Sequence, residues 1–298
     1  MAAAPAVGPK TDLRERVWLS LLRYGIPDSR FGSDFSSFHP DFRDSSRAIE
    51  CTVNLPGYRV AKTMFIGPDN ALQELRYRAL QAGKLVLTTT YALRRGFILL
   101  DPQRISADKY EVASMLDGME KLGRTISMAQ LRDELREIKI CFTGARAVST
   151  HGRRFGNGLG HFDLAWGILS DRKLVNPATP VIGVIHDCQV VDPEALELQP
   201  VTSTHWDVPC DYVVTPAKMC QLTFTEKPTQ GIIWDQLKPG QLESIPDLQE
   251  LKGIQMMEKI MQDMAPTPET QNPAPSMPTA DELMGIQMME RIMKGYKS

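Results

Sequence analysis

Three glycines alternate over five residues, at Gly156, Gly158 and Gly160, with Arg154 before them and Asp163 after them. Glycine lets backbone N–H groups approach an anion closely, and a helix that begins after such a loop adds unpaired donors and a partial positive charge. An arginine contributes bidentate charge, and a carboxylate at Asp163 can hold the magnesium ion of a nucleotide. These residue types in this order predict a phosphate-binding loop, with an ordinary glycine-rich turn as the alternative.

The elements on either side of this loop are those that a phosphate-binding loop needs. Residues 138–144 form an apolar run that predicts a buried strand leading into the loop, and Phe162, Ala165, Trp166 and Leu169 recur at helical spacing after it. No Lys-Ser or Lys-Thr pair follows the glycines, and their spacing is not Gly-x-Gly-x-x-Gly. The loop is therefore neither a Walker loop nor a dinucleotide fingerprint.

From residue 61 onward, apolar runs alternate with helical patterns. Strands are expected at 61–67, 84–90, 96–100, 138–144, 180–186 and 212–215, with a short one at 231–234. Helices are expected at 11–24, 70–82, 109–122 and 128–137; Gly83 ends the second, and Ser127 with Gln130 forms a capping box for the last. This alternation predicts a three-layer α/β/α domain with a largely parallel, doubly wound sheet, in which ligands bind at the carboxyl ends of the strands.

The segment 25–60 has weak periodicity, and four phenylalanines in it are interleaved with arginines: Phe31, Phe35, Phe38 and Phe42. We expect a loop that its aromatic side chains pin to the core. A lid over a heterocyclic ligand is the alternative.

Composition narrows the class of protein. The 298 residues carry a formal charge of −2, which gives no global field to recruit nucleic acid. Five cysteines without a Cys-x-x-Cys pair argue against a disulfide framework and for a reducing, cytoplasmic compartment. The histidine spacing indicates no zinc site, the N-terminus lacks the pattern of a signal peptide, and no apolar run reaches the ~20 residues that span a bilayer.

The composition changes at about residue 239, so we expect an α/β domain at 1–238 and a flexible Pro-rich tail at 239–298. Segments 251–261 and 283–293 are identical at nine of eleven positions and predict two amphipathic helices, at 251–264 and 281–295, each with an Ile/Met stripe. Repetition across a linker favours a tether that binds a protein partner or self-associates and gains avidity. Packing of both helices on the core is the alternative.

The residues from Arg154 to Asp163 resemble the Arg-Leu-Gly-x-Gly-x-Gly-Tyr-Tyr-Asp motif of the 5-formyltetrahydrofolate cyclo-ligase (methenyltetrahydrofolate synthetase) family. The family's opening Lys-x-x-Leu-Arg matches residues 10–14, and Asp211 fits its aspartate before a β run. Three further segments resemble the divergent branch that includes methenyltetrahydrofolate synthetase domain-containing proteins: 75–84, 186–192 and 208–216. Together these motifs cover roughly residues 10 to 216.

The resemblance implies a fold like that of the NagB/RpiA/CoA-transferase proteins and an ATP-dependent reaction that converts 5-formyltetrahydrofolate to 5,10-methenyltetrahydrofolate. It implies that Lys10, Arg14 and Arg154 bind the ATP phosphates, with Arg154 also catalytic, and that Asp163 and Asp211 hold Mg2+. The implied backbone cradle comprises Gly156, Asn157, Gly158, Leu159, Gly160, His161 and Phe162. The glutamate that holds folate in the family has no clear counterpart near residues 69–73.

Two functions follow from these patterns. The first is an ATP-dependent cyclo-ligase-like enzyme acting on a folate-like small molecule, or on a related compound of folate or thiamine metabolism, with a C-terminal tether. The second is a non-catalytic nucleotide- or pterin-binding module whose tail targets it to an assembly such as a bacterial microcompartment.

Overall fold

The computed structural model describes residues 17–35, 38–155, 160–192, 206–222 and 226–264. Two compact units divide the chain, Met1–Lys252 and Gly253–Ser298. The division lies after the expected boundary at 238, because Ile245, Leu248 and Leu251 are buried in the first unit.

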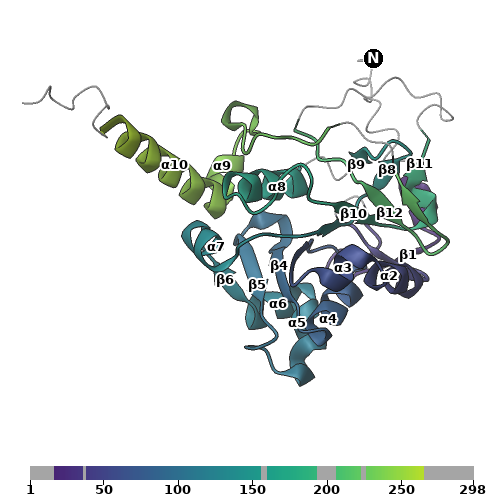
Figure 1. Cartoon of the computed structure of the whole chain (residues 1–298). Coiled ribbons are helices and arrows are strands. Elements are labelled where there is room, and N and C mark those ends of the chain that lie inside the picture. The colour runs from purple at the N-terminus through teal and green to yellow at the C-terminus, as the bar shows by residue number, and fades with distance from the viewer. Residues whose placement is uncertain (1–16, 36–37, 156–159, 193–205, 223–225, 265–298) are drawn as a thin grey trace, which may run out of the picture. The chain divides into compact units, whose positions relative to one another are not determined.

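An eight-stranded sheet runs through the first unit (Figure 1), in the order β13, β12, β10, β7, β3, β4, β5 and β6. The strands from β12 to β4 are parallel neighbours, and β13, β5 and β6 pair antiparallel at the two edges. The largely parallel sheet that the sequence predicts is confirmed. The bounds are β3 Thr63–Ile66, β4 Leu85–Thr89, β5 Phe97–Leu100, β6 Arg124–Ile126, β7 Cys141–Thr143, β10 Val181–Val184, β12 Tyr212–Val214 and β13 Met219–Gln221.

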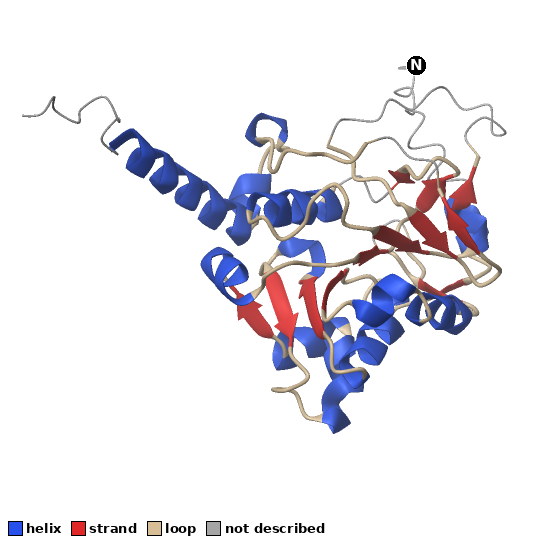
Figure 2. Ribbon diagram, viewed as in Figure 1, coloured by secondary structure: helices blue, strands red, loops and turns tan. Residues whose placement is uncertain are grey.

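Helices cover both faces of this sheet (Figure 2). On one face, Met64 and Ile66 of β3 belong to a core cluster with residues of the helices α2 to α6. On the other face, Phe65 packs against Phe162 of α8, with 5.9 Å between the ring centres. The alternation of strand side chains thus produces the three layers. The helix bounds are α2 Ser45–Val53, α3 Pro56–Val60, α4 Gln73–Gln81, α5 Tyr110–Ser114, α6 Leu116–Leu122, α7 Met128–Glu134, α8 His161–Asp171, α9 Gln241–Ser244 and α10 Pro246–Met264.

Several helix predictions hold with changed bounds. Asn70–Leu72 is a 3-10 turn that continues into α4, and the predicted Ser127–Gln130 capping box begins α7. The single helix expected at 109–122 is wrong: extended backbone at Met115 separates α5 from α6, and Gly118 there lies against the carbonyl of Val112. At the N-terminus, the described part of the expected helix is helical only over 17–21.

The segment 25–60 is more ordered than a loop. It contains α2 and α3 and a two-stranded sheet of β1 (Gly25–Ile26) and β2 (Asp41–Phe42). The aromatic pinning that the sequence predicts is present, because Phe35 and Phe38 are buried in a second core cluster with Val17, Leu21 and Phe155.

The strand expected at 231–234 is wrong. Instead of pairing with a strand, the amide of Ile232 donates to Asp171 Oδ2 at 2.9 Å, and the 3-10 turn Trp234–Gln236 follows. A side-chain acceptor on α8 thus replaces the backbone ladder.

A small sheet separates β7 from the glycine loop. Its strands β9 (Arg154–Phe155), β8 (Ala147–Ser149) and β11 (Val190–Val191) lie in the order β11, β8, β9. The sequence predicts a direct passage from the strand 138–144 into the loop, and this detail is wrong, since the β8–β9 hairpin intervenes and delivers Arg154.

The first predicted tail helix is part of α10, and the second lies outside the described residues. None of the helices in the described part of the chain is both long and apolar enough to cross a membrane. All five cysteines are free.

Candidate functional site

A cavity of about 410 Å³ lies at the carboxyl ends of β3, β4 and β7, the sheet edge at which α/β proteins bind ligands. The strands contribute Phe65, Thr89 and Thr143, the residues 67–69 follow β3, and α8 contributes its first turn. Loop residues from four parts of the chain complete the wall: Phe38, His39, Tyr91, Ala92, Trp206–Val208 and the segment 231–241. The volume is in the range of small-molecule sites.

Arg154 lines this cavity and is held on three sides. Its Nε donates to the carbonyl of Val208 at 2.8 Å, its Nη2 pairs with Asp163, and its guanidinium lies 4.2 Å from the centre of the Phe162 ring. The side chain is 7% exposed, and Nη1 makes no hydrogen bond to a described residue. A fixed guanidinium with donors to spare can bind an anion.

Asp163 lies in the first turn of α8. Its Oδ1 accepts from Arg154 and from the amide of Val208 at 3.0 Å. Burial raises the pKa of Asp163, and Arg154 and the Val208 amide offset this only in part. Oδ2 has no donor among the described residues, so one carboxylate oxygen remains for a ligand in the cavity.

The start of α8 supplies the helix terminus that the sequence predicts. Gly160 precedes the helix with φ of +68°, a conformation that glycine adopts at little cost. The first intrahelical bond runs from the Leu164 amide to the Gly160 carbonyl, so the amides of residues 161–163 have no acceptor within the helix. Lys10, Arg14 and the predicted cradle residues Gly156, Asn157, Gly158 and Leu159 lie outside the described residues.

Asp211 is not brought into this cavity. It precedes β12 at the amino end of the parallel strands, where Oδ2 accepts from the Val181 amide and pairs with Lys227 Nζ, each at 2.6 Å. Lys227 is itself only 1% exposed and also donates to the Thr179 carbonyl. The structure thus places Asp211 in a buried ion pair. Among the described residues, no group of three His, Cys, Asp or Glu side chains is arranged to hold a metal ion.

Sequence reasoning missed a histidine–aspartate pair in the cavity wall. His39 Nδ1 lies 2.8 Å from Asp69 Oδ1, and Asp69 Oδ2 accepts from the Gly144 amide at 2.7 Å. The fully buried Arg76 donates to the carbonyls of Gly67 and Asp69 at 2.5 and 3.1 Å. Asp69 lies three residues after the buried strand β3, at its carboxyl end, and that position was the available signal.

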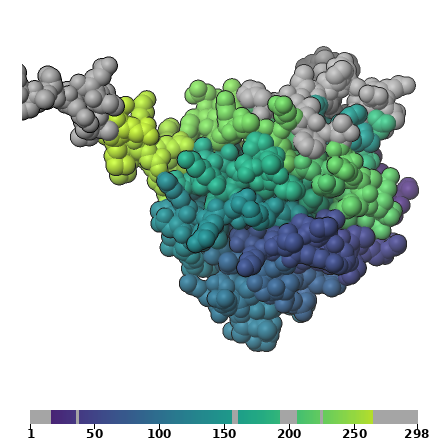
Figure 3. All heavy atoms as spheres, in the orientation of Figure 1, coloured from purple at the N-terminus to yellow at the C-terminus, as the bar shows by residue number. Residues whose placement is uncertain are grey.

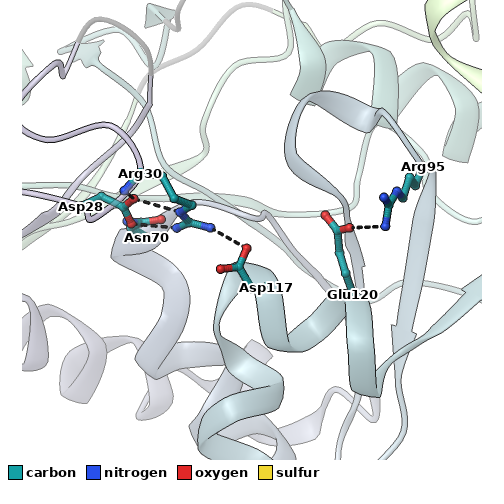
Figure 4. Close-up of polar contacts among 6 residues, drawn as sticks. All are labelled: Asp28, Arg30, Asn70, Arg95, Asp117 and Glu120. Atoms are coloured by element: carbon teal, nitrogen blue, oxygen red, sulfur yellow. Dashed lines mark hydrogen bonds and ion pairs between the residues drawn. The ribbon is translucent and has the colours of Figure 1, made fainter.

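A surface network braces the same wall (Figure 4). Asn70 donates to Asp28 Oδ2 at 2.7 Å, and Arg30 bridges Asp28 to Asp117 of α6. The hydrogen bonds from Arg30 hold the pKa of Asp28 well below its usual range, so Asp28 is a firmly ionised acceptor. Asn70, the residue after Asp69, is thereby attached to the loop that contains Asp28 and Arg30.

The segment 231–241 was also missed as part of the site. It packs on α8, where a Cβ at Gly167 would lie 2.8 Å from Ile232 Cδ1. In Figures 1 and 3 this green part of the chain lies beside the teal α8. Ile232, Ile233 and Leu237 therefore add an apolar wall to the cavity.

The chain is similar to the methenyltetrahydrofolate synthase domain-containing proteins of Mus musculus, Bos taurus and Homo sapiens, at 28%, 28% and 29% identity. The matches cover 89%, 82% and 83% of this chain and 69%, 62% and 63% of those relatives, so the chain spans about two thirds of their length.

Two solved structures are also similar in part. The 5,10-methenyltetrahydrofolate synthetase of Aquifex aeolicus matches at 17% identity and a TM-score of 0.43, over 72% of this chain and 92% of its own. That of Mycoplasma pneumoniae matches at 13% and 0.40, over 70% of this chain and 98% of its own.

The family assignment rests on sequence. The model of the 5-formyltetrahydrofolate cyclo-ligase family matches residues 10–216, which include β3 to β12, Arg154 and the first turn of α8. The chain belongs to the 5-formyltetrahydrofolate cyclo-ligase family.

Proposed function

We propose that this protein is an ATP-using cyclo-ligase-type enzyme that closes a ring onto the formyl carbon of a folate-like compound. Family membership supports a folate-related cyclo-ligase. The observation that carries the proposal is Arg154, which Asp163, Val208 and Phe162 hold in a cavity beside the start of α8.

The donor set fits a phosphate. Val208 and Asp163 orient the Arg154 guanidinium, and the helix backbone orients the first-turn amides of α8. These donors are therefore in place before an anion binds, and little reorganisation is needed. We further propose Lys10, Arg14 and the loop 156–160 on the same phosphates, from the family motif they match.

The magnesium site is proposed in a narrower form than the motif implies. Asp163 Oδ2 fits a single Mg2+ contact, and Mg2+ commonly takes one or two carboxylates with water and phosphate oxygens. Asp211 fits poorly, since it is committed to Lys227 and does not line the cavity. When bound, Mg-ATP would supply the phosphoryl group that activates the formyl oxygen.

Arg154 would then neutralise charge on the transferred group, and Asp163 would keep the guanidinium in one orientation. The apolar wall at Ile232, Ile233 and Leu237 would exclude water from the reacting carbon. Positioning and charge stabilisation are the usual demands of phosphoryl transfer.

A turnover assay tests the enzyme proposal. Purified protein with Mg-ATP and 5-formyltetrahydrofolate should generate the absorbance of the methenyl product. Thermal melting with each ligand separates the two functions: a binding module would be stabilised without turnover. If neither ligand raises Tm and no product forms, both functions are wrong.

A tether function for the tail is proposed as a second role. Met256, Met257, Ile260 and Met261 of α10 are between 48% and 66% exposed, an apolar set suited to a partner groove. A fluorescent protein fused to residues 253–298 should bind a protein partner or self-associate. The double variant Met257→Asp with Met289→Asp should prevent this association. Gln262→Asp, which adds one of these two charges at an exposed polar position, is the control.

A further inference from the structure

The phosphate chemistry proposed above does not use the His39–Asp69 pair, although both side chains line the cavity. The pair is short, 2.8 Å from His39 Nδ1 to Asp69 Oδ1, and its side chains are 16% and 15% exposed. Asp69 is fixed further by the Gly144 amide on Oδ2 and by Arg76 on its carbonyl. These hydrogen bonds hold the Asp69 side chain in a single orientation.

These contacts determine the charge of Asp69. Burial alone would raise the pKa of Asp69, but His39, the Gly144 amide and Arg76 together lower it. The Gly144 amide donates to Asp69 Oδ2, which favours the ionised form; a carboxylate can only accept hydrogen bonds, so His39 Nδ1 donates. In a neutral imidazole, Nε2 is then the acceptor.

His39 Nε2 has no partner in the described part of the protein and is shielded from bulk water. An unpaired buried acceptor costs free energy unless a ligand supplies a donor. His39 belongs to the cavity wall, and a ligand whose N–H reached Nε2 there would supply the missing donor. A carboxylate, an imidazole and a substrate donor in series form the arrangement of a general base with its orienting group.

We propose that His39 is the general base of ring closure, with Asp69 as its positioning residue. The inference rests on the proposed function. As the amine nitrogen of the substrate forms the new C–N bond with the formyl carbon, its N–H bond breaks and the proton passes to His39 Nε2. Phosphate leaves with the formyl oxygen that ATP has phosphorylated, so atoms and charge balance. The Asp69 carboxylate stabilises the imidazolium.

His161, Arg154 and Asp163 also line the cavity but are not equivalent to His39. Burial, and after it the proximity of His39 and Lys238, lowers the pKa of His161 to about 4, and no carboxylate hydrogen-bonds to its ring among the described residues. Arg154 is a cation and offers no acceptor, and Asp163 pairs with it through Oδ1 and is proposed above to contact Mg2+ through Oδ2. His39 is thus the imidazole at this cavity that a carboxylate orients, within the described residues.

The tautomer of His39 provides a test that does not depend on turnover. Long-range 1H–15N spectra of the 15N-histidine-labelled full chain should show His39 protonated at Nδ1. Asp69→Asn should move that proton to Nε2, because the Asn amide would donate to Nδ1 while its oxygen keeps the Gly144 amide. Adding 5-formyltetrahydrofolate should shift the wild-type Nε2 resonance. Wild-type protonation at Nε2, or no shift on adding the folate, would overturn the proposal.

Kinetics provide the second arm. In single turnovers with saturating Mg-ATP, His39→Gln and Asp69→Asn should each slow product formation by ~10²-fold or more, with Kd values for both ligands within about threefold of wild type. His151→Gln, at an exposed turn, is the matched control and should leave the rate unchanged. A His39→Gln rate within about threefold of wild type would overturn the role of base.

The two arms also separate this inference from the enzyme proposal. A wild-type protein that binds the folate and shifts Nε2 but forms no product contradicts the enzyme proposal and the base role together, and leaves His39 as a folate-binding group. Product formation with a normal His39→Gln rate contradicts only the role of His39.

Discussion

Two buried ion pairs at opposite ends of the parallel strands have different surroundings. Arg154–Asp163 lines the cavity and keeps a guanidinium nitrogen and a carboxylate oxygen without protein partners in the described residues. Asp211–Lys227 is more completely enclosed, and its atoms bond to the Val181 amide and the Thr179 carbonyl. The first pair can exchange partners for a ligand, whereas the second fastens the strand β12 and the loop at 226–228.

Removing one charge from the first pair should affect both stability and binding. Arg154→Met strands a buried carboxylate and should lower the free energy of unfolding by about 3–5 kcal/mol. Adding Asp163→Asn should restore most of that stability but not Mg-ATP affinity, since the donors to phosphate stay absent. Urea unfolding and isothermal titration measure the two effects.

The second pair serves as the contrast. The double variant Asp211→Asn with Lys227→Met should bind Mg-ATP with wild-type affinity under conditions in which it is folded. If this variant lost Mg-ATP binding while keeping the wild-type Tm, Asp211 would have to be counted as a magnesium ligand.

At the scale of elements, the start of α10 is attached to the sheet through a buried acid. Asp247 lies against Gly96, where a Cβ would meet its carboxylate at 2.2 Å, and Gly96 has a φ of +75°. Its Oδ2 is buried and has no hydrogen-bond partner in the described part of the chain. Burial, and secondarily Glu250, raises the pKa of Asp247 from 3.8 to about 7.

Asp247 should make stability depend on pH. Between pH 3.8 and about 7, the folded protein holds a proton on Asp247 that the unfolded chain has released. Stability should therefore fall as the pH rises through this window and stay reduced above it. Asp247→Asn should raise the free energy of unfolding by about 1–3 kcal/mol at pH 8 and change it little at pH 4.

The measurement is urea unfolding of wild type and variant across pH 4–8. Glu243→Gln, an exposed acid on the neighbouring α9, is the matched control and should leave the pH profile as it is. A stability difference between Asp247→Asn and wild type that does not change with pH would contradict the assigned protonation.

At the scale of the whole molecule, the compact unit that carries the cavity extends to Lys252. Ile245, Leu248 and Leu251 are at most 3% exposed, and Glu250 Oε1 accepts from the Met128 amide at 3.1 Å. Beyond that point the side chains of α10 include the exposed methionines described above. The first repeat thus begins with the buried Leu251 and continues with exposed side chains.

Truncations should locate this boundary. A chain ending at residue 264 should keep the wild-type Tm, because its residues 1–252 are complete. A chain ending at 240 loses three buried aliphatic side chains, each worth about 1.5–3 kcal/mol, and should be unfolded or strongly destabilised. Differential scanning calorimetry of both chains decides it, and equal Tm values would place the tail boundary back near residue 238.

Local patterns in the sequence determined the parallel sheet and the start of α8. Apolar runs such as Cys141–Thr143 and Val181–Val184, separated by helices, indicate buried parallel strands. Such strands need apolar residues on both faces. The glycine, arginine and aspartate around α8 were equally visible, since helix termini and their anion-binding donors depend on neighbouring residues.

Only the tertiary structure decided which polar groups meet. His39 and Asp69 are 30 residues apart, and Asp211 and Lys227 are joined across segments that sequence spacing does not relate. Asp211 resembles a metal ligand in its motif, yet a buried lysine occupies its carboxylate. Such pairings depend on where loops from different strands converge. That convergence is set by packing of the entire sheet with its helices, which the local sequence does not encode.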